Sequence, residues 1–167
     1  SAAGQIAVAI QRKWADDMLR ESEANLRESE SKMRTLVTSM NEGLTHVDND
    51  EVMEFVNDRL CEMTGYKRDE LIGKTTLDVL FDQDGRESVL RANEQRRQGV
   101  SGQYESRIRK KSGEMIWVLI SGAPVMNTEG VVTGTLGMFI DISERKRAED
   151  QLLHDSFHDG LTCLFNL

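Results

Sequence analysis

Cysteine is scarce in this sequence: its 167 residues include two, Cys61 and Cys163, which lie far apart. Two distant cysteines do not form a disulfide framework, and this usage is typical of proteins in reducing compartments. The sequence also contains no run of about 18 apolar residues and no recognisable signal peptide. These absences predict a cytoplasmic location and no contact with a membrane by this part of the chain.

Proline is nearly absent, with one residue, and this favours long helices without interruption. Acidic side chains outnumber basic ones by 29 to 21, which leaves a net charge of -8. Such a surface repels phosphates, so we expect no nucleic-acid partner. The chain also lacks an initial Met and begins directly in a helical pattern, so we expect one domain with extensions, taken from a longer protein.

Residues 5–40 are predicted to form a long helix, because they contain no glycine or proline and are rich in Ala, Glu, Arg, Leu and Met. Apolar residues recur at every seventh position: Leu19, Leu26, Met33 and Met40. A second row is weaker, with small or polar side chains at Ala15, Ser22 and Ser29 before Leu36. This marginal coiled-coil pattern has three interpretations: pairing of two chains, packing on the chain's own domain, or a solvated linker.

Beyond Gly43 the hydrophobic pattern changes to that of short strands joined by turns. We expect strands over residues 44–47 and 52–56, a helix over 59–64 that Asn57 or Asp58 caps and Gly65 ends, and irregular or one-turn segments over 71–73 and 77–81. Asp84 and Glu87 resemble a capping box, which predicts a helix that runs to Gln98.

Three further strands, over 103–110, 115–125 and 131–142, are joined by short turns and predict an antiparallel meander. The last two are apolar on both faces, unlike the strands of a sheet with one face open to water. We therefore expect the N-terminal helix or a partner chain to cover the second face. After Ile142 the sequence becomes charged and helical, with Ser143 as the expected cap.

The order of these predicted elements, together with four local motifs, resembles the PAS domain. The motifs are residues 55–57 with 63–66 (FVN and MTGY), 70–74 (ELIGK), 104–118 (YE, then KSG and WV) and 141–146 (DISERK). The resemblance implies an α+β fold, with a five-stranded antiparallel sheet, short helices on one face and flanking N- and C-terminal signalling helices. It places a linker helix at 1–31, the PAS domain at 32–148, and an exit helix with the start of another domain at 149–167.

Both flanks resemble neighbours of PAS domains in bacterial signalling proteins. Residues 5–12 (QIAVAIQR) are similar to the final helix of a GAF domain, and residues 158–166 (HDGLTCLFN) to the opening of a GGDEF diguanylate cyclase domain. Two positions depart from that opening, with Cys163 in place of glycine and Leu167 in place of arginine. The cyclase motif would follow residue 167, so we expect no catalytic residues here and a parent protein that makes cyclic-di-GMP.

No cofactor or metal is predicted. Haem-binding PAS domains hold the iron with a histidine on the long helix, and the helix that ends at Gln98 has none. Light-sensing flavin relatives carry a reactive cysteine where this sequence has Thr76. His154 and His158 have the i, i+4 spacing of a zinc pair, but no third ligand accompanies them in the sequence pattern.

In this family a small-molecule pocket lies between the sheet and the short helices. The candidates to line it are Phe55, Asn57, Leu77, Tyr104, Ser106 and Met138. The alternative is that these side chains fill the core and that Asn57 only caps a helix. The predicted signal relay is the junction after the last strand, because a change in the sheet must leave through it: Asp141, Ile142, Ser143, Glu144 and Arg145.

The sequence thus predicts a sensory and dimerising module that relays a signal to a diguanylate cyclase through its flanking helices. We expect a homodimer that pairs through the N-terminal helix and the sheet face, with an unidentified small molecule as a ligand. Two alternatives stay open: a ligand-free dimerisation scaffold, and the sensor module of a histidine kinase.

Overall fold

The computed structural model describes residues 2–162 and the side chains of residues 2–153. The chain forms two compact units, which divide between Ser39 and Met40. The first unit is a single helix, α1 (Ala2–Ser39), and none of its described residues is buried. Four residues discussed above lie outside the residues with described side chains: His154, His158, Cys163 and Leu167.

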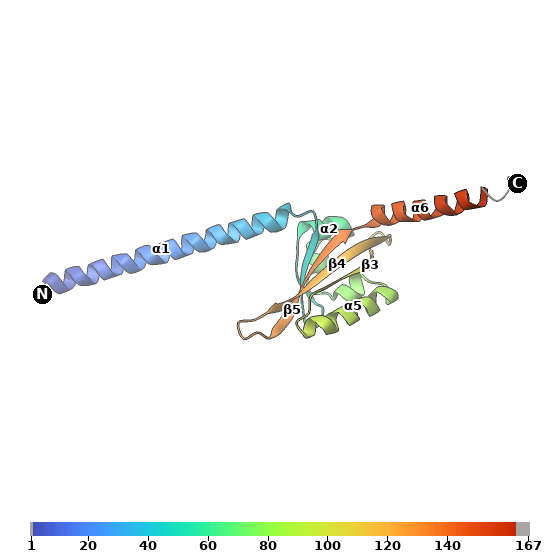
Figure 1. Ribbon diagram of the computed structural model, residues 1–167. Coiled ribbons are helices and arrows are strands. Elements are labelled where there is room, and N and C mark those ends of the chain that lie inside the picture. The colour runs from blue at the N-terminus through green and yellow to red at the C-terminus, as the bar shows by residue number, and fades with distance from the viewer. Residues whose placement is uncertain (1, 163–167) are drawn as a thin grey trace. The chain divides into compact units, whose positions relative to one another are not determined.

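The second unit is built on a five-stranded antiparallel sheet with the order β2-β1-β5-β4-β3. Its strands are β1 (Gly43–Asp48), β2 (Met53–Val56), β3 (Gly102–Arg109), β4 (Met115–Met126) and β5 (Val132–Asp141). The last three form the predicted meander, and β5 also pairs with β1, so the first and last strands lie side by side (Figure 1).

Four helices connect β2 to β3, and one follows β5. They are α2 (Asp58–Thr64), α3 (Arg68–Leu71), α4 (Thr76–Val79), α5 (Gln83–Arg97) and α6 (Ser143–Thr162). We call the sheet face toward α5 the inner face and the opposite one the outer face. The main core residues are Met53, Val56, Leu60, Leu71, Leu80, Val89, Ile108, Ile116, Val118, Ile120 and Phe139. The predicted α+β fold is confirmed, with helices on one face of the sheet (Figure 1).

Several predicted boundaries differ from those of the structure, among them the start of α5 and the start of β2. The N-cap of α5 is Asp82 rather than Asp84, because the extended backbone of Asp82 lets its carboxylate accept from the Gly85 N–H at 3.0 Å. Asp84 lies within the first turn of that helix. Val52 lies outside β2 and forms an isolated bridge with Thr75, the N-cap of α4.

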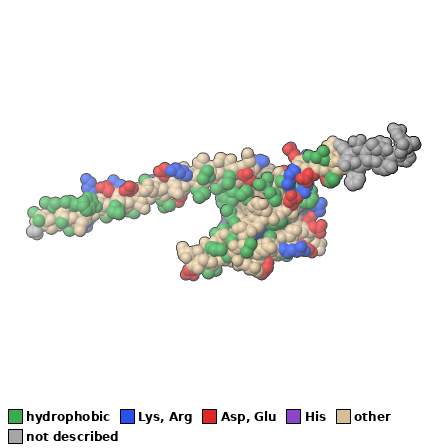
Figure 2. Space-filling model, in the orientation of Figure 1, with side chains coloured by type: hydrophobic (Ala, Val, Ile, Leu, Met, Phe, Trp, Pro, Cys, Tyr) green, Lys and Arg blue, Asp and Glu red, His purple; other side chains and the backbone are tan. Residues whose placement is uncertain are grey.

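The two faces of the sheet differ in exposure. On the inner face, Ile116, Val118 and Ile120 are buried, as alternation along β4 predicts. On the outer face, Trp117 is 38% exposed and Leu136 is 41% exposed. Hydrophobic side chains are visible both on the surface of this unit and along α1 (Figure 2). The strands are thus apolar on both faces, and the cover expected from a partner chain stays a prediction. None of the described helices has the length and apolarity needed to cross a bilayer.

Candidate functional site

A small cavity lies between the inner face of the sheet and α5. Its volume is about 20 Å³, which is room for one water molecule. Its apolar walls are Val47, Phe81, Val89, Ile120 and Phe139, and its polar side chains are Thr45, Glu51, Thr76, Arg96, Tyr104 and Thr135. Threonine, tyrosine and two charged groups make this the polar centre of an otherwise apolar core.

Glu51 lines this cavity from the turn between β1 and β2. Its φ of 64° lies in the left-handed region, which few residues other than glycine adopt. Its Oε2 accepts from the Thr76 Oγ1 at 2.7 Å, which joins the turn to α4. Burial raises the pKa of the Glu51 carboxyl, and the hydrogen bond from Thr76 and the charge of Arg96 oppose that rise. Glu51 is therefore a partly compensated acid in the core.

Arg96 reaches the same cavity from α5 and is 5% exposed. Its Nη1 donates to the Asn93 Oδ1 at 2.6 Å, and its guanidinium carbon lies 5.8 Å from the centre of the Tyr104 ring. The guanidinium lies against Gly122 of β4, where a β-carbon would overlap it. Its Nε and Nη2 are buried and make no hydrogen bond of ordinary geometry to a described residue, and the charge of Arg96 acts on Glu51 and Tyr104.

Sequence reasoning missed both charged residues of this cavity. The signal that could have found Arg96 is helical spacing. Arg96 follows the buried Val89 by seven residues and therefore lies on the same inward row of α5. Charged residues are normally assigned to the solvent face, and for that reason the row appears to end at Val89. Glu51 carries no such signal, because its burial depends on the fold of the turn.

The six predicted ligand residues fall into four groups. Tyr104 lines the cavity, and Ser106 lies beside it on the same face of β3. Leu77 is partly buried against the core but does not line the cavity. Phe55 and Met138 lie on the outer face, opposite Val56 and Phe139 in the alternation of β2 and β5, so neither can line a pocket on the inner side.

Asn57, the sixth, is 3% exposed and joins β1 to α2. Its Oδ1 accepts from the N–H groups of Leu44 at 2.8 Å and Leu60 at 3.0 Å, and its Nδ2 donates to the Glu42 carbonyl at 3.0 Å. These bonds make Asn57 the N-cap of α2. The sequence offered two interpretations of Asn57, a pocket-lining residue or a helix cap, and the bonds agree with the second.

The outer face carries a more open apolar groove of about 390 Å³. It is lined by Met40, Leu44, Ser101, Gly102, Gln103, Ser121, Gly122, Ala123, Leu136 and Met138. The lining contains no charged side chain, so the groove suits an apolar partner surface better than an ionic ligand.

The predicted relay residues form the junction between β5 and α6. The backbone pairing of β4 with β5 continues into the junction, where the Ile142 N–H donates to the Trp117 carbonyl at 2.9 Å. The Ser143 hydroxyl then accepts from the Trp117 N–H at 3.1 Å, and the Asp141 Oδ1 accepts from the Ser143 N–H at 2.9 Å. The predicted role of Ser143 as the cap of α6 is therefore wrong, because its hydroxyl accepts from the sheet. Asp141 provides the acceptor for the first turn of α6 instead.

A cluster of charges fastens the first turn of α6 to the outer face of β3 and β4. Glu105 accepts from Arg145 and, at 2.6 Å, from the Lys146 Nζ. Lys146 also lies 5.3 Å from the centre of the Trp117 ring, a cation–π distance. These hydrogen bonds lower the pKa of the Glu105 carboxyl, with Lys146 as the larger cause. Glu144, the remaining relay candidate, is exposed.

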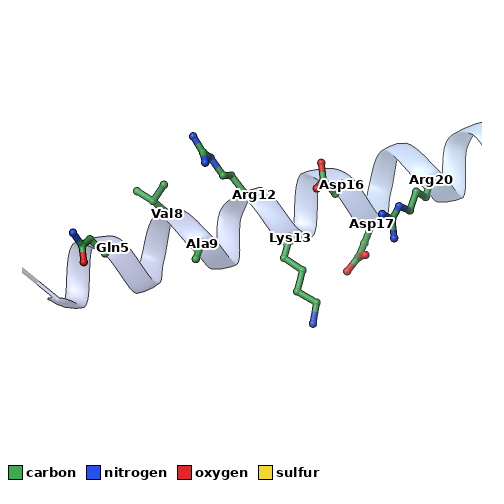
Figure 3. A pocket seen from close by; sticks show the side chains of 8 residues that line it. All are labelled: Gln5, Val8, Ala9, Arg12, Lys13, Asp16, Asp17 and Arg20. Atoms are coloured by element: carbon green, nitrogen blue, oxygen red, sulfur yellow. The ribbon is translucent and has the colours of Figure 1, made fainter.

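A hollow of about 500 Å³ lies along one face of α1 and begins in the segment that resembles a GAF helix. Its lining comes from one helix: Gln5, Val8, Ala9, Arg12, Lys13, Asp16, Asp17 and Arg20 (Figure 3). The side chains point away from the helix axis and do not converge on a point, so this is an open helix surface and not a ligand site (Figure 3).

Comparison with known proteins agrees with this architecture. The chain is 28% identical over 142 residues to the C4-dicarboxylate transport sensor protein DctS of Rhodobacter capsulatus, which covers 84% of this chain and 20% of that protein. It is 28% identical over 98 residues to the probable diguanylate cyclase DgcE of Escherichia coli, which covers 56% of this chain and 8% of that protein. The chain thus spans a fifth or less of the length of these two relatives.

Solved structures share the fold. The PAS domain of an HTR-like protein from Haloarcula marismortui matches with a TM-score of 0.63 at 20% identity, covering 74% of this chain and 99% of that one. A PAS domain from Colwellia psychrerythraea matches with a TM-score of 0.62 at 18% identity, covering 68% and 97%. The family model described as "PAS domain" matches residues 41–144, from the start of the sheet unit to the first turn of α6. This chain belongs to the PAS domain family.

Proposed function

We propose that this chain is the sensory and dimerising module of a cytoplasmic signalling protein and that it relays changes in its sheet through α6 to an output domain. The observation that carries the proposal is the junction itself. Backbone and side-chain bonds join Trp117 of β4 to Ile142 and Ser143, and Glu105 of β3 holds Arg145 and Lys146. A shift of β3 or β4 relative to the core therefore displaces the base of the helix that leaves the domain.

The proposed output is a diguanylate cyclase. Two observations support it: the similarity of residues 158–166 to the opening of a GGDEF domain, and the relationship to the probable cyclase DgcE. The alternative output is a histidine kinase or another signalling enzyme. The relationship to the transport sensor DctS supports a sensory role and leaves that alternative open.

We propose that the outer face pairs two copies of the chain, with α1 contributing a coiled coil. The groove there has no charged lining and includes Leu136, which is 41% exposed, and Trp117 is 38% exposed on the same face of the sheet. The heptad-spaced Leu19, Leu26 and Met33 of α1 are 60%, 61% and 63% exposed, so each helix offers an apolar row to a partner. A monomer would leave both surfaces in water, and this costs about 25 cal/mol for each Å² of apolar area.

The test fuses the chain to the N-terminal end of an active diguanylate cyclase domain. Leu136→Glu places a charge in the apolar groove, and we expect it to halve the mass in light scattering or raise the dimer dissociation constant at least about tenfold. Cyclic-di-GMP production should change with it. Leu90→Glu is the matched control, because Leu90 is 55% exposed on α5 and lies outside the groove. Equal mass and equal output for both variants would refute pairing through this face.

A further inference from the structure

A histidine lies among the apolar side chains of the outer face of the sheet. His46 belongs to β1, and its cross-strand neighbours are Leu136 of β5 and Phe55 of β2. These two neighbours are 41% and 40% exposed. Leu136 also lines the outer-face groove, whose lining contains no charged side chain. His46 thus places a titratable ring beside the surface that is proposed to pair two copies of the chain.

An irregularity in the sheet gives this ring an acidic neighbour. The register of β1 with β2 shifts between His46 and Val47, and the consecutive residues Glu54 and Phe55 are both exposed there. The Glu54 Oε2 lies 3.2 Å from the Nδ1 of His46. Because an ionised carboxylate only accepts hydrogen bonds, the proton of the neutral ring lies on Nδ1.

The other ring nitrogen of His46 is closed off from water. Its Nε2 is buried and makes no hydrogen bond to a described residue. It lies over Gly134 of β5, where a β-carbon would come within 3.1 Å of it. Protonation of the ring adds an N–H at this nitrogen, and a buried donor without an acceptor is costly. The charged ring therefore has to turn toward water.

We propose that the outer face pairs two copies of the chain only while His46 is neutral, so that acidification separates them. This inference rests on the proposed pairing through that face. In a single copy, 27% of the His46 side chain is exposed, and the ring has water to turn to. A second copy seated on Leu136 and Phe55 removes that water and places the charged ring against apolar side chains.

The charges around His46 do not offset this cost. Glu54 is 57% exposed, and an ion pair in contact with water contributes little. Asp48, the next acid on β1, accepts through its Oδ1 from two backbone N–H groups of the following turn. The facing segment of β5, residues 134–138, contains no charged side chain. The paired face therefore offers no group that would hold the added proton.

The expected response to pH is opposite to the one that the overall charge of the chain predicts. The net charge is -8, and the isoelectric point is about 5.0. Lowering the pH toward that value reduces the repulsion between two copies and would tighten a pairing governed by net charge. Protonation of His46 weakens pairing instead, so the sign of the response separates the two explanations.

The test measures the dimer dissociation constant of the 167-residue chain by sedimentation velocity at about pH 8 and about pH 6, at one ionic strength. An ordinary histidine is about three-quarters protonated at the lower pH, whereas ordinary carboxylates keep their charge. Each dimer contains two copies of His46, so protonation acts twice. We expect the dissociation constant to be at least about tenfold larger at the lower pH.

Two variants remove the titrating ring. His46→Phe keeps an aromatic side chain on the outer face, and His46→Gln supplies a second uncharged side chain should phenylalanine disturb the fold in circular dichroism. Both should pair at the two pH values without the loss at the lower one. The double variant His154→Gln, His158→Gln changes the other two histidines of the sequence and should keep the response of the parent chain.

The outcomes separate the role of His46 from the pairing itself. A parent chain whose dimer is equally tight or tighter at the lower pH would overturn the role of His46 and leave the pairing intact. An acid response that the His46 variants retain would do the same. A parent chain that is monomeric at both pH values would refute pairing through the outer face and the inference that rests on it.

Discussion

Asn57 shows how one side chain can hold a strand and a helix together. It accepts from two backbone N–H groups and donates to one carbonyl, all within 3.0 Å, and the two bonds that it accepts are buried. Asn57→Ala leaves the Leu44 and Leu60 N–H groups unsatisfied in the core. We expect it to lower the free energy of unfolding by about 2–4 kcal/mol in urea denaturation.

Asn127→Ala is the matched control for that substitution. The Asn127 Oδ1 also accepts from two backbone N–H groups, those of Glu129 and Val131, but in an exposed turn. Water replaces these bonds, so the loss should stay below about 1 kcal/mol. Equal losses for the two variants would show that burial does not set the importance of Asn57.

Glu51 makes stability depend on pH in the direction opposite to that of a salt-bridged acid. Burial raises its pKa in the folded chain above the value in the unfolded chain. The folded state then binds the proton more tightly than the unfolded state does, and proton binding by Glu51 stabilises the fold. This stabilisation is complete below the ordinary carboxyl pKa and is lost as the pH rises through the raised pKa. Glu51→Gln should therefore raise the urea midpoint at pH 7 and flatten the decline between acidic and neutral pH.

The exposed Glu129→Gln provides the comparison for Glu51→Gln and should leave the pH profile unchanged. A Glu51→Gln variant that is less stable than the parent at pH 7, with the same pH profile, would mean that the charged form of Glu51 is favoured in the fold.

At the scale of the elements, strand alternation decides how much of the site the sequence predicts. The alternation of β3 places Tyr104 and Ser106 on the inner face, as predicted. In β5 the same rule places Met138 on the outer face. In β2 a register shift interrupts the alternation, so Met53 and Val56 are both buried and Phe55 lies on the outer face, which depends on strand pairing and not on the local sequence. The five-stranded sheet and the sequence of its elements could be predicted, whereas the buried charges Glu51 and Arg96 could not.

The base of α6 owes its attachment to contacts between residues far apart in the sequence. Glu105 on β3 binds Arg145 and Lys146, and Lys146 also lies over Trp117. Glu105→Gln should release this turn, and we expect hydrogen exchange of residues 144–150 to accelerate about two- to fivefold. High salt should produce part of the same effect in the parent chain, because the cluster is exposed.

Glu94→Gln removes an exposed acid of α5 and should leave the exchange of residues 144–150 unchanged. If Glu105→Gln also leaves it unchanged, the ion pairs do not fasten α6, and the backbone bonds of Trp117 with Ile142 and Ser143 alone hold the junction.

At the scale of the whole molecule, the proposed role of the domain is to link two helices. The family match ends at residue 144, and α6 continues to Thr162, toward the segment that resembles the start of a cyclase. A signal carried along such a helix depends on which of its faces meets the partner helix, so helical phase is the property to vary. Each residue inserted into a helix turns everything beyond it by about 100°.

The most direct measurement is cyclic-di-GMP production by the cyclase fusion with one, two, four or seven alanines inserted after Asp150, beyond the Glu105 cluster. Seven residues restore the phase to within about 20°, and two shift it by about 200°. The account predicts output close to the parent for seven residues and a changed output for two. Equal output from all four insertions would show that α6 does not carry the signal.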